Sequence, residues 1–252
     1  MKFSFKVIIP VRFASTRLPG KPLLMIGQKP LIEHVYESAV KSSASKVIIA
    51  TDDDRIDDVA RSFGATVVMT STEHLSGTDR INEVLMKLDN PVDEIIVNVQ
   101  GDEFGLGPAL IDQVAIALYD HPDRHMATLC ERIADKEMYT DPNIVKVVMD
   151  RNKLALYFSR SPIPWINTGL EHTTGISGEA YKHIGIYAYH SGFLKTFAGL
   201  PKSCLEQQES LEQLRALYHG YKIHVEEVPQ KTGIEINTEE DLARARKVAG
   251  YF

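Results

Sequence analysis

A basic loop carries the most distinctive chemistry in the sequence. Residues 10–22 are PVRFASTRLPGKP, in which Arg12, Arg17 and Lys21 are interleaved with Ser, Thr and Gly. Guanidinium, ammonium and backbone N–H groups bind phosphate oxygens through charge-assisted hydrogen bonds. The segment matches neither the P-loop pattern G-x-x-x-x-G-K-[ST] nor the dinucleotide pattern G-x-G-x-x-G. It therefore predicts a phosphate-binding loop of another kind, and the alternative is a solvated basic loop.

Two shorter polar segments have the residue types to complete such a site. Residues 100–103 are QGDE, and the Asp102 carboxylate suits Mg²⁺, which takes one or two protein carboxylates and completes its shell with phosphates and water. Taken alone, Asp102 is more typical of a cap or turn. Residues 76–80 are SGTDR, which fits a nucleotide site and fits a turn with a helix cap equally well.

The first half of the chain alternates between strand and helix patterns. We expect strands at residues 5–9, 46–50, 66–69 and 94–99, and helices at residues 31–40, 54–63, 79–88 and 108–120. This alternation predicts an α/β fold with a mostly parallel open sheet and helices on both faces. Ligands of such sheets bind beyond the carboxyl ends of the strands. The basic loop and Asp102 both follow strands there, so we expect them to lie close together.

The second half has a different pattern, in which strands follow one another. We expect a hairpin of residues 144–149 and 154–159, strands at 183–189 and 222–228, and helices at 205–218 and 238–248. These strands predict a smaller antiparallel extension. We therefore expect a single domain over residues 1–252. Its core would comprise about 1–125 and 190–252, and a lid or dimer surface would comprise about 126–189.

Composition excludes several classes of protein. The chain has 252 residues, 44% of them hydrophobic, which is enough for a core and argues against disorder. Its 28 Lys and Arg against 34 Asp and Glu disfavour binding to nucleic acid or anionic membranes through overall charge. Cys130 and Cys204 lack metal-ligand spacing and are predicted to be buried. Apolar runs fall short of the ~18–20 residues of a membrane span, and we expect a cytoplasmic protein.

Seven segments together resemble one enzyme family. They are RFASTRLPGKPL (12–23), ATD (50–52), SGTDR (76–80), VNVQGDE (97–103), YFSRSPIPW (157–165), HIGIY (183–187) and LEQLR (211–215). Their order and spread over nearly the whole chain resemble the sugar nucleotidyltransferases, and specifically the CMP-Kdo synthetases. These are cytidylyltransferases that activate 3-deoxy-manno-octulosonate (Kdo). The resemblance implies a Rossmann-like nucleotidyltransferase fold and Mg²⁺ as cofactor.

The resemblance also assigns candidate roles to residues of this chain. The catalytic group would be Arg12, Arg17, Lys21 and Asp102. The CTP site would comprise Arg12, Ser15, Arg17, Lys21, Asp52, Gly77, Thr78, Arg80 and Gln100. The sugar acid would contact Gln100, Arg160, His183, Tyr187, Glu212 and Gln213, although taken singly His183 and Tyr187 fit strand residues and Glu212 fits a solvated helix face. Metal ligands would be Asp102, Asn237 and Glu235.

The chain departs from the family pattern at two places. Phe104 and two added glycines follow the QGDE segment, where family members usually have Pro and an aliphatic residue. Asn237 stands where the family has an Asp as a second magnesium ligand, so Glu235 is expected to share that role. Both changes flank the expected sugar and metal site. They make the 8-amino-8-deoxy analogue of Kdo a second candidate acceptor.

The expected reaction is transfer of CMP from CTP to the anomeric hydroxyl of Kdo or its 8-amino analogue, with release of pyrophosphate. The resemblance implies that the product supplies lipopolysaccharide assembly and that the enzyme is a homodimer. Two alternatives remain open. One is a cytidylyltransferase for another sugar acid, such as a sialic acid. The other is a CTP-binding protein without catalytic activity.

Overall fold

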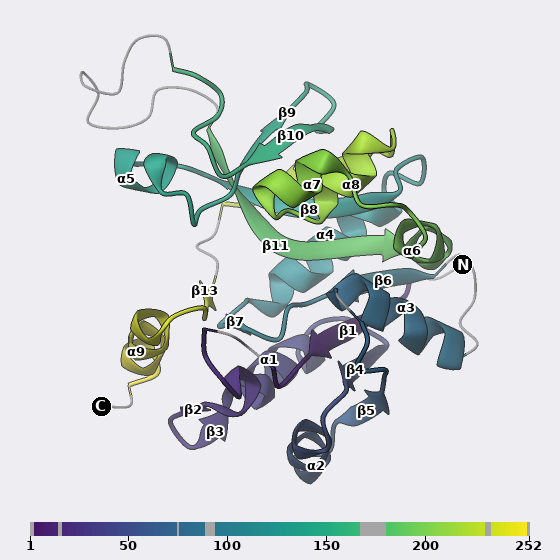
Figure 1. Cartoon of the computed structure of the whole chain (residues 1–252), viewed down its shortest axis with the longest axis vertical. Coiled ribbons are helices and arrows are strands. Elements are labelled where there is room, and N and C mark those ends of the chain that lie inside the picture. Colours follow the sequence, from purple (N-terminus) through teal and green to yellow (C-terminus); the bar gives the residue numbers. More distant parts are fainter. Residues whose placement is uncertain are drawn as a thin grey trace.

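A nine-stranded mixed sheet with helices on both faces forms the body of the protein (Figure 1). The computed structural model describes residues 3–14, 17–74, 76–88, 94–166, 180–229 and 233–250. Within this part of the chain the main sheet has the order β10-β9-β11-β6-β1-β4-β5, and off this path β8 pairs with β11 and β12 pairs with β8. The expected fold, a mostly parallel open sheet with an antiparallel extension, is confirmed.

The parallel half follows the predicted alternation of strand and helix. Its strands are β1 (Phe5–Val11), β4 (Lys46–Thr51), β5 (Thr66–Met69) and β6 (Ile95–Asn98), paired in parallel in the order β6-β1-β4-β5. Its helices are α1 (Leu31–Val40), α2 (Asp54–Ser62), α3 (Gly77–Lys87) and α4 (Pro108–Tyr119). Helix α3 begins two residues earlier than predicted, because the Ser76 side chain accepts a hydrogen bond from Asp79 N at 3.1 Å.

Alternate residues of β1 belong to different hydrophobic cores. Val7 and Ile9 pack in the cluster that contains Leu31 of α1 and Val114 of α4. Ile8 belongs to the cluster that contains residues of α3 and α6 (Ser191–Ala198). Because successive side chains of a strand point to opposite faces, β1 is buried on both sides. This burial fixes the position of the loop that leaves its carboxyl end.

The antiparallel half continues the same sheet. It contains β8 (Met126–Arg132), β9 (Lys146–Met149), β10 (Ala155–Ser159), β11 (Tyr181–His190) and β12 (Ile223–Glu227). The predicted β9–β10 hairpin is confirmed, and β11 pairs antiparallel with β6 and so joins the two halves. Strand β8, which the sequence pattern did not predict, pairs with β11 and with β12. The short helix α5 (Lys136–Thr140) follows β8.

The predicted single helix over residues 205–218 is wrong. Two helices, α7 (Cys204–Glu209) and α8 (Gln213–Tyr218), replace it, and Ser210 between them has a φ of 54°, in the left-handed region. Arg215 of α8 donates two hydrogen bonds to Glu206 of α7, at 2.8 and 2.6 Å. This buried ion pair holds the two helices together across the break.

Short elements surround the carboxyl ends of the strands. They are the 3₁₀ turn η1 (Lys21–Leu23), β2 (Met25–Ile26), β3 (Lys29–Pro30), β7 (Glu103–Phe104) and β13 (Ile234–Glu235). The C-terminal helix α9 (Glu239–Val248) was predicted correctly, and it lies beside β13 at the left of Figure 1. The Thr238 side chain caps it by accepting from Asp241 N at 3.2 Å.

The two cysteines occupy different environments. Cys130 in β8 is buried, as predicted, but Cys204 is exposed, and the expectation that it is buried was wrong. Cys204 is the first residue of α7, where its side chain is directed away from the core. Among the described residues, no helix has the length and apolar character needed to cross a bilayer.

Candidate active site

A cavity with a volume of about 560 Å³ lies beyond the carboxyl ends of β1 and β6. It is lined by residues from four of the seven segments named above, by residues next to them, and by two residues near the C-terminus. Of the predicted site residues, it brings together Arg12, Arg17, Lys21, Gly77, Arg80, Gln100, Asp102, Glu212, Glu235 and Asn237. The expectation that the basic loop and Asp102 meet at one edge of the sheet is therefore confirmed.

The basic loop folds back on itself after β1. Gly20 N donates to Phe13 O at 3.3 Å, and Gly20 has a φ of 67°, which favours glycine. The Arg55 guanidinium lies 3.4 Å from the centre of the Phe13 ring, and Asp53 holds it with two hydrogen bonds of 2.9 and 2.6 Å. Ser15, a predicted CTP ligand, lies outside the described residues.

Lys21 lies at the centre of a cluster of oxygen atoms. Its Nζ donates to Asp102 Oδ2 at 2.7 Å, to Ile236 O at 2.8 Å and to Asn237 Oδ1 at 3.2 Å. Arg17 Nη2 donates to the same Asn237 oxygen at 2.9 Å. A protonated amine thus occupies a place built from one carboxylate, one amide oxygen and one carbonyl. We call these three oxygen ligands the cation seat.

A small two-stranded ladder holds the two sides of the cation seat together. Strand β7 directly follows Asp102 and pairs antiparallel with β13, and Ile236 N donates to Asp102 O at 3.0 Å. Gly233 makes this approach possible, because a Cβ there would lie 2.2 Å from Phe104 O. Asp102 and the segment of Ile236 and Asn237, more than 130 residues apart in the sequence, are therefore held side by side, and the oxygen atoms of the cation seat have fixed positions.

Two further carboxyl groups lie in this ladder. Glu103 and Glu235 are directly opposite each other, and Glu235 Oε1 accepts from Asn237 Nδ2 at 2.6 Å. Burial, with the nearby charges of Glu235 and Asp102, raises the pKa of Glu103 to about 8. Burial and then the charge of Asp102 raise the pKa of Glu235. Crowded carboxylates of this kind favour a neighbouring cation, which Lys21 provides.

The oxygen ligands of the cation seat are those that magnesium prefers. The described residues contain no group of three or more His, Cys, Asp or Glu side chains arranged to hold a metal ion. Magnesium does not need one, because it typically takes one or two carboxylates and completes its shell with phosphate oxygens and water. The Lys21 ammonium shows that Asp102 and Asn237 already accept a positive charge in common. The residues therefore fit Mg²⁺ bound together with a polyphosphate.

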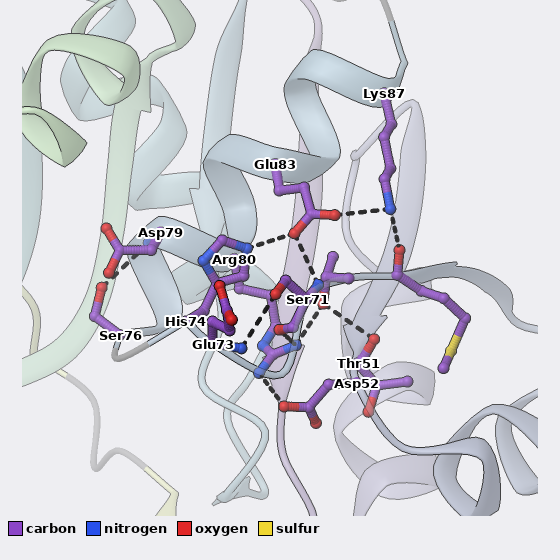
Figure 2. Close-up of polar contacts among 12 residues, drawn as sticks. Thr51, Asp52, Ser71, Glu73, His74, Ser76, Asp79, Arg80, Glu83 and Lys87 are labelled. Atoms are coloured by element: carbon purple, nitrogen blue, oxygen red, sulfur yellow. Dashed lines mark hydrogen bonds and ion pairs between the residues drawn. The ribbon is translucent and has the colours of Figure 1, made fainter.

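The opposite side of the cavity is formed by the start of α3. Arg80 is only 3% exposed, and its Nη2 donates to Asp52 Oδ2 at 2.7 Å (Figure 2). Asp52 does not line the cavity, so in this structure it holds Arg80 in place. A Cβ at Gly77 would lie 3.1 Å from Pro10 Cγ, so the helix begins in close contact with the end of β1. Thr78 is buried and also outside the lining.

Among the predicted sugar-acid residues, Gln100 and Glu212 line the cavity. Glu212 Oε2 accepts from Thr78 Oγ1 at 2.8 Å, and burial raises the Glu212 pKa, whereas that hydrogen bond lowers it. The Glu212 carboxyl thus joins α8 to α3 at the cavity wall.

Four predicted sugar-acid residues lie outside the cavity lining: Arg160, His183, Tyr187 and Gln213. Arg160 Nε donates to Glu209 O at 2.9 Å. His183 Nε2 is 2.9 Å from Thr128 Oγ1, and burial lowers its pKa to about 3, so its ring is neutral. Tyr187 and Gln213 are buried. Their roles toward the sugar acid stay predictions.

Sequence patterns missed two polar residues of the cavity lining, His74 and Ser210. His74 lies two residues before the SGTDR segment, and that proximity was the available signal. Ser210 is at the break between α7 and α8, in the middle of the single helix predicted over residues 205–218.

Comparisons with known proteins agree with this geometry. A model of the cytidylyltransferase family matches residues 6–223. The 3-deoxy-manno-octulosonate cytidylyltransferase of Thioalkalivibrio sulfidiphilus (strain HL-EbGR7) is 52% identical over 246 residues, covering 97% of this chain and 98% of the relative. The enzyme of that name from Pseudomonas fluorescens (strain SBW25) is 50% identical over 253 residues, covering 99% of this chain and 100% of the relative.

A solved structure gives the same result at the level of the fold. It is CMP:2-keto-3-deoxy-manno-octonic acid synthetase complexed with CTP, and it superposes with a TM-score of 0.89 at 40% identity, covering 98% of this chain and 99% of that one. The family match and the full-length relatives lead to one conclusion. The chain belongs to the cytidylyltransferases, and among them to the 3-deoxy-manno-octulosonate cytidylyltransferase (CMP-Kdo synthetase) family.

Proposed function

We propose that this protein transfers CMP from CTP to the anomeric hydroxyl of Kdo and releases pyrophosphate. One observation carries the proposal: three cationic side chains of the basic loop and the Asp102 carboxylate share one cavity with the start of α3. The full-length relatives that carry the name 3-deoxy-manno-octulosonate cytidylyltransferase support the choice of acceptor. The CTP complex of the similar solved structure supports the choice of nucleotide.

The reaction is a direct displacement at phosphorus. The hydroxyl oxygen of the sugar acid forms a bond to the α-phosphorus as the bond to the α–β bridging oxygen breaks, and the hydroxyl proton is released. Pyrophosphate leaves with the electron pair of the broken bond. Arg12, Arg17 and Lys21 stabilise the charge that grows on the leaving group. No covalent enzyme intermediate is needed, and we assign no nucleophile to the protein.

Magnesium is part of this proposal. Asp102 and Asn237, with Glu235 beside them, would hold it in the cation seat. When bound, the ion would neutralise phosphate charge and lower the pKa of the attacking hydroxyl. For this chain the consequence is that Lys21 must leave the cation seat and turn toward the phosphates. Asn237 stands where the family has an Asp, so this chain offers one negative charge fewer to the ion. The charge of the bound nucleotide therefore contributes more to holding the ion.

Turnover of defined acids tests the proposal. The protein is incubated with CTP and Mg²⁺ and with Kdo, the 8-amino-8-deoxy analogue of Kdo, or a sialic acid, and pyrophosphate release is followed. We expect Kdo or its 8-amino analogue to be used. Turnover of a sialic acid alone would replace the proposed acceptor, and tight CTP binding without turnover of any acid would indicate a non-catalytic CTP-binding protein.

The proposal includes the setting of the enzyme. We infer a homodimer in the cytoplasm, whose product supplies lipopolysaccharide assembly, with the strands between residues 126 and 189 as the dimer surface. Light scattering of the purified protein measures the oligomeric state. A monomer at all concentrations would remove the dimer from the proposal without affecting the chemistry.

A further inference from the structure

A second polar cluster joins α3 to the segment before it. Glu83 lies one helical turn beyond Arg80 and faces the segment that carries Ser71 and His74 (Figure 2). Ser71 N donates to Glu83 Oε2 at 2.9 Å, and His74 Nε2 contacts the same oxygen. Lys87 contacts the other oxygen, Oε1, at 2.7 Å. Glu83 therefore holds both the backbone and the imidazole of a segment that reaches the cavity.

The protonation of Glu83 decides which imidazole nitrogen carries hydrogen. Burial alone would raise the Glu83 pKa, but the hydrogen bonds from Lys87, Ser71 N and His74 outweigh it and lower the pKa to about 2. An ionised carboxylate only accepts hydrogen bonds, so Nε2 of His74 must donate. In a neutral imidazole the other nitrogen, Nδ1, is then an acceptor.

The other ring nitrogen of His74, Nδ1, belongs to a side chain of the cavity wall. His74 lines the cavity on the side of Gly77 and Arg80, and its side chain is 22% exposed. Nδ1 makes no hydrogen bond with any of the described residues. An acceptor fixed at the wall of a nucleotide pocket favours a base that offers a donor. Cytosine offers its 4-amino group, whereas uracil has a carbonyl oxygen at the same position.

We propose that His74 selects cytosine by accepting a hydrogen bond from the 4-amino group through Nδ1, and that Glu83 is the positioning residue that fixes the required tautomer. The inference rests on the proposed use of CTP and goes beyond it. His74 contacts the base, and Glu83 acts through His74. Arg80 supports the same segment from the other side, because its guanidinium contacts Ser71 O at 3.5 Å and also Thr70 Oγ1.

Nucleotide preference provides the first test. Rates with Kdo are measured for CTP, UTP and the triphosphate of pyrimidin-2-one riboside, which lacks any group at the 4-position. For His74→Ala we expect the CTP preference over both analogues, in kcat/KM, to fall about tenfold or more, mainly through KM for CTP. With the pyrimidin-2-one nucleotide, His74→Ala and the unmodified protein should have about the same rate. An unchanged CTP preference in His74→Ala would overturn the proposal.

Variants at Glu83 separate positioning from general stability. Glu83→Ala should lose most of the CTP preference, whereas Glu83→Gln retains an acceptor oxygen for Ser71 N and His74 Nε2 and should retain most of it. Lys87→Gln is the matched control, because Lys87 contacts Glu83 Oε1 and Met69 O but not the oxygen that holds His74, and its CTP preference should equal that of the unmodified protein. Equal losses in all three variants would indicate a merely structural cluster.

The tautomer itself is measured by ¹⁵N NMR of the CTP complex. The His74 signals are assigned by their absence in His74→Asn, and we expect protonated Nε2 and unprotonated Nδ1. A doubly protonated ring, or hydrogen on Nδ1, would overturn the proposal whatever the kinetics. If no nucleotide is turned over with any acid, the proposed function fails, whereas turnover of CTP with an unchanged preference in His74→Ala contradicts only the role of His74.

Discussion

The Lys21 ammonium and a divalent cation need the same oxygen atoms. Its nitrogen lies 2.7 Å from Asp102 Oδ2 and 3.2 Å from Asn237 Oδ1, which are the two proposed ligands. We expect Mn²⁺ to bind weakly to the nucleotide-free protein and several-fold more tightly to Lys21→Met, measured by electron paramagnetic resonance. Activity of that variant should fall roughly 100-fold or more, because a cation that stabilises the leaving group is lost.

The control for this prediction is Lys29→Met. Lys29 pairs with Glu33 and Glu37 of α1, away from the cavity lining, so Mn²⁺ binding should not change. Equal Mn²⁺ affinities for Lys21→Met and the unmodified protein would show that the ammonium does not compete for the cation seat.

Acid stability depends on Glu83. Its pKa of about 2 in the folded protein lies below the ordinary value of 4.5, so its hydrogen bonds stabilise the fold above pH 4.5 and are lost as the pH falls toward 2. We expect Glu83→Gln to unfold more easily than the unmodified protein at pH 7, by about 1–2 kcal/mol. Urea titrations between pH 7 and 2 should show this difference shrinking, and a difference that is constant over the range would contradict the low pKa.

Among the elements, the β7–β13 ladder has the most direct effect on the site. A Cβ at Gly233 would lie 2.2 Å from Phe104 O, so Gly233→Ala must displace one strand and separate Asp102 from Asn237. We expect kcat/KM to fall at least tenfold, since displacing catalytic groups by about 1 Å is costly. Gly107→Ala is the control, because a Cβ there meets nothing within 4 Å. Similar losses in both variants would exclude the ladder as the cause.

Sequence patterns predicted the elements that have strong internal periodicity. The helices of the parallel half and α9 show apolar spacing or caps, and strands such as β1 are short runs that are apolar except for one residue. The two-residue strands β7 and β13 are too short for a pattern, so only the structure shows how Asp102 meets Asn237. The break at Ser210 was missed because the leucines at 211, 214 and 217 have helical spacing, and the six-residue gap from Leu205 to Leu211 was the only sign of the break. The left-handed backbone of Ser210 and the ion pair between Arg215 and Glu206 determine how α7 and α8 meet.

The candidate site was predicted in part from chemistry and in part from resemblance. Arg12, Arg17, Lys21 and Asp102 were found from residue type and from their place after strands, and the cavity contains all four. Asn237 and Glu212 were found through the resemblance alone, because an amide or an acid near the C-terminus has no spacing that identifies it. His74 was missed because a single histidine in a polar segment has several ordinary interpretations.

At the scale of the whole molecule, the cavity depends on distant parts of one chain. Its lining extends from Pro10 to Asn237 and includes Glu212, the residue just before α8. Ligand binding should therefore stabilise the fold as a unit. At a CTP concentration of 100 times Kd we expect a gain of about 2.7 kcal/mol, or roughly 5–10 °C in Tm. Calorimetry should show one transition that shifts, and two transitions of which one stays fixed would contradict this coupling.

The unequal environments of the two thiols make the native chain suitable for site-specific labelling. Burial raises the pKa of Cys130 to about 12, which leaves it without a reactive thiolate at neutral pH, whereas Cys204 is exposed. A maleimide dye would therefore attach at the start of α7, six residues before Ser210 of the cavity lining. Fluorescence from that single position would report nucleotide arrival in real time, without any engineered cysteine.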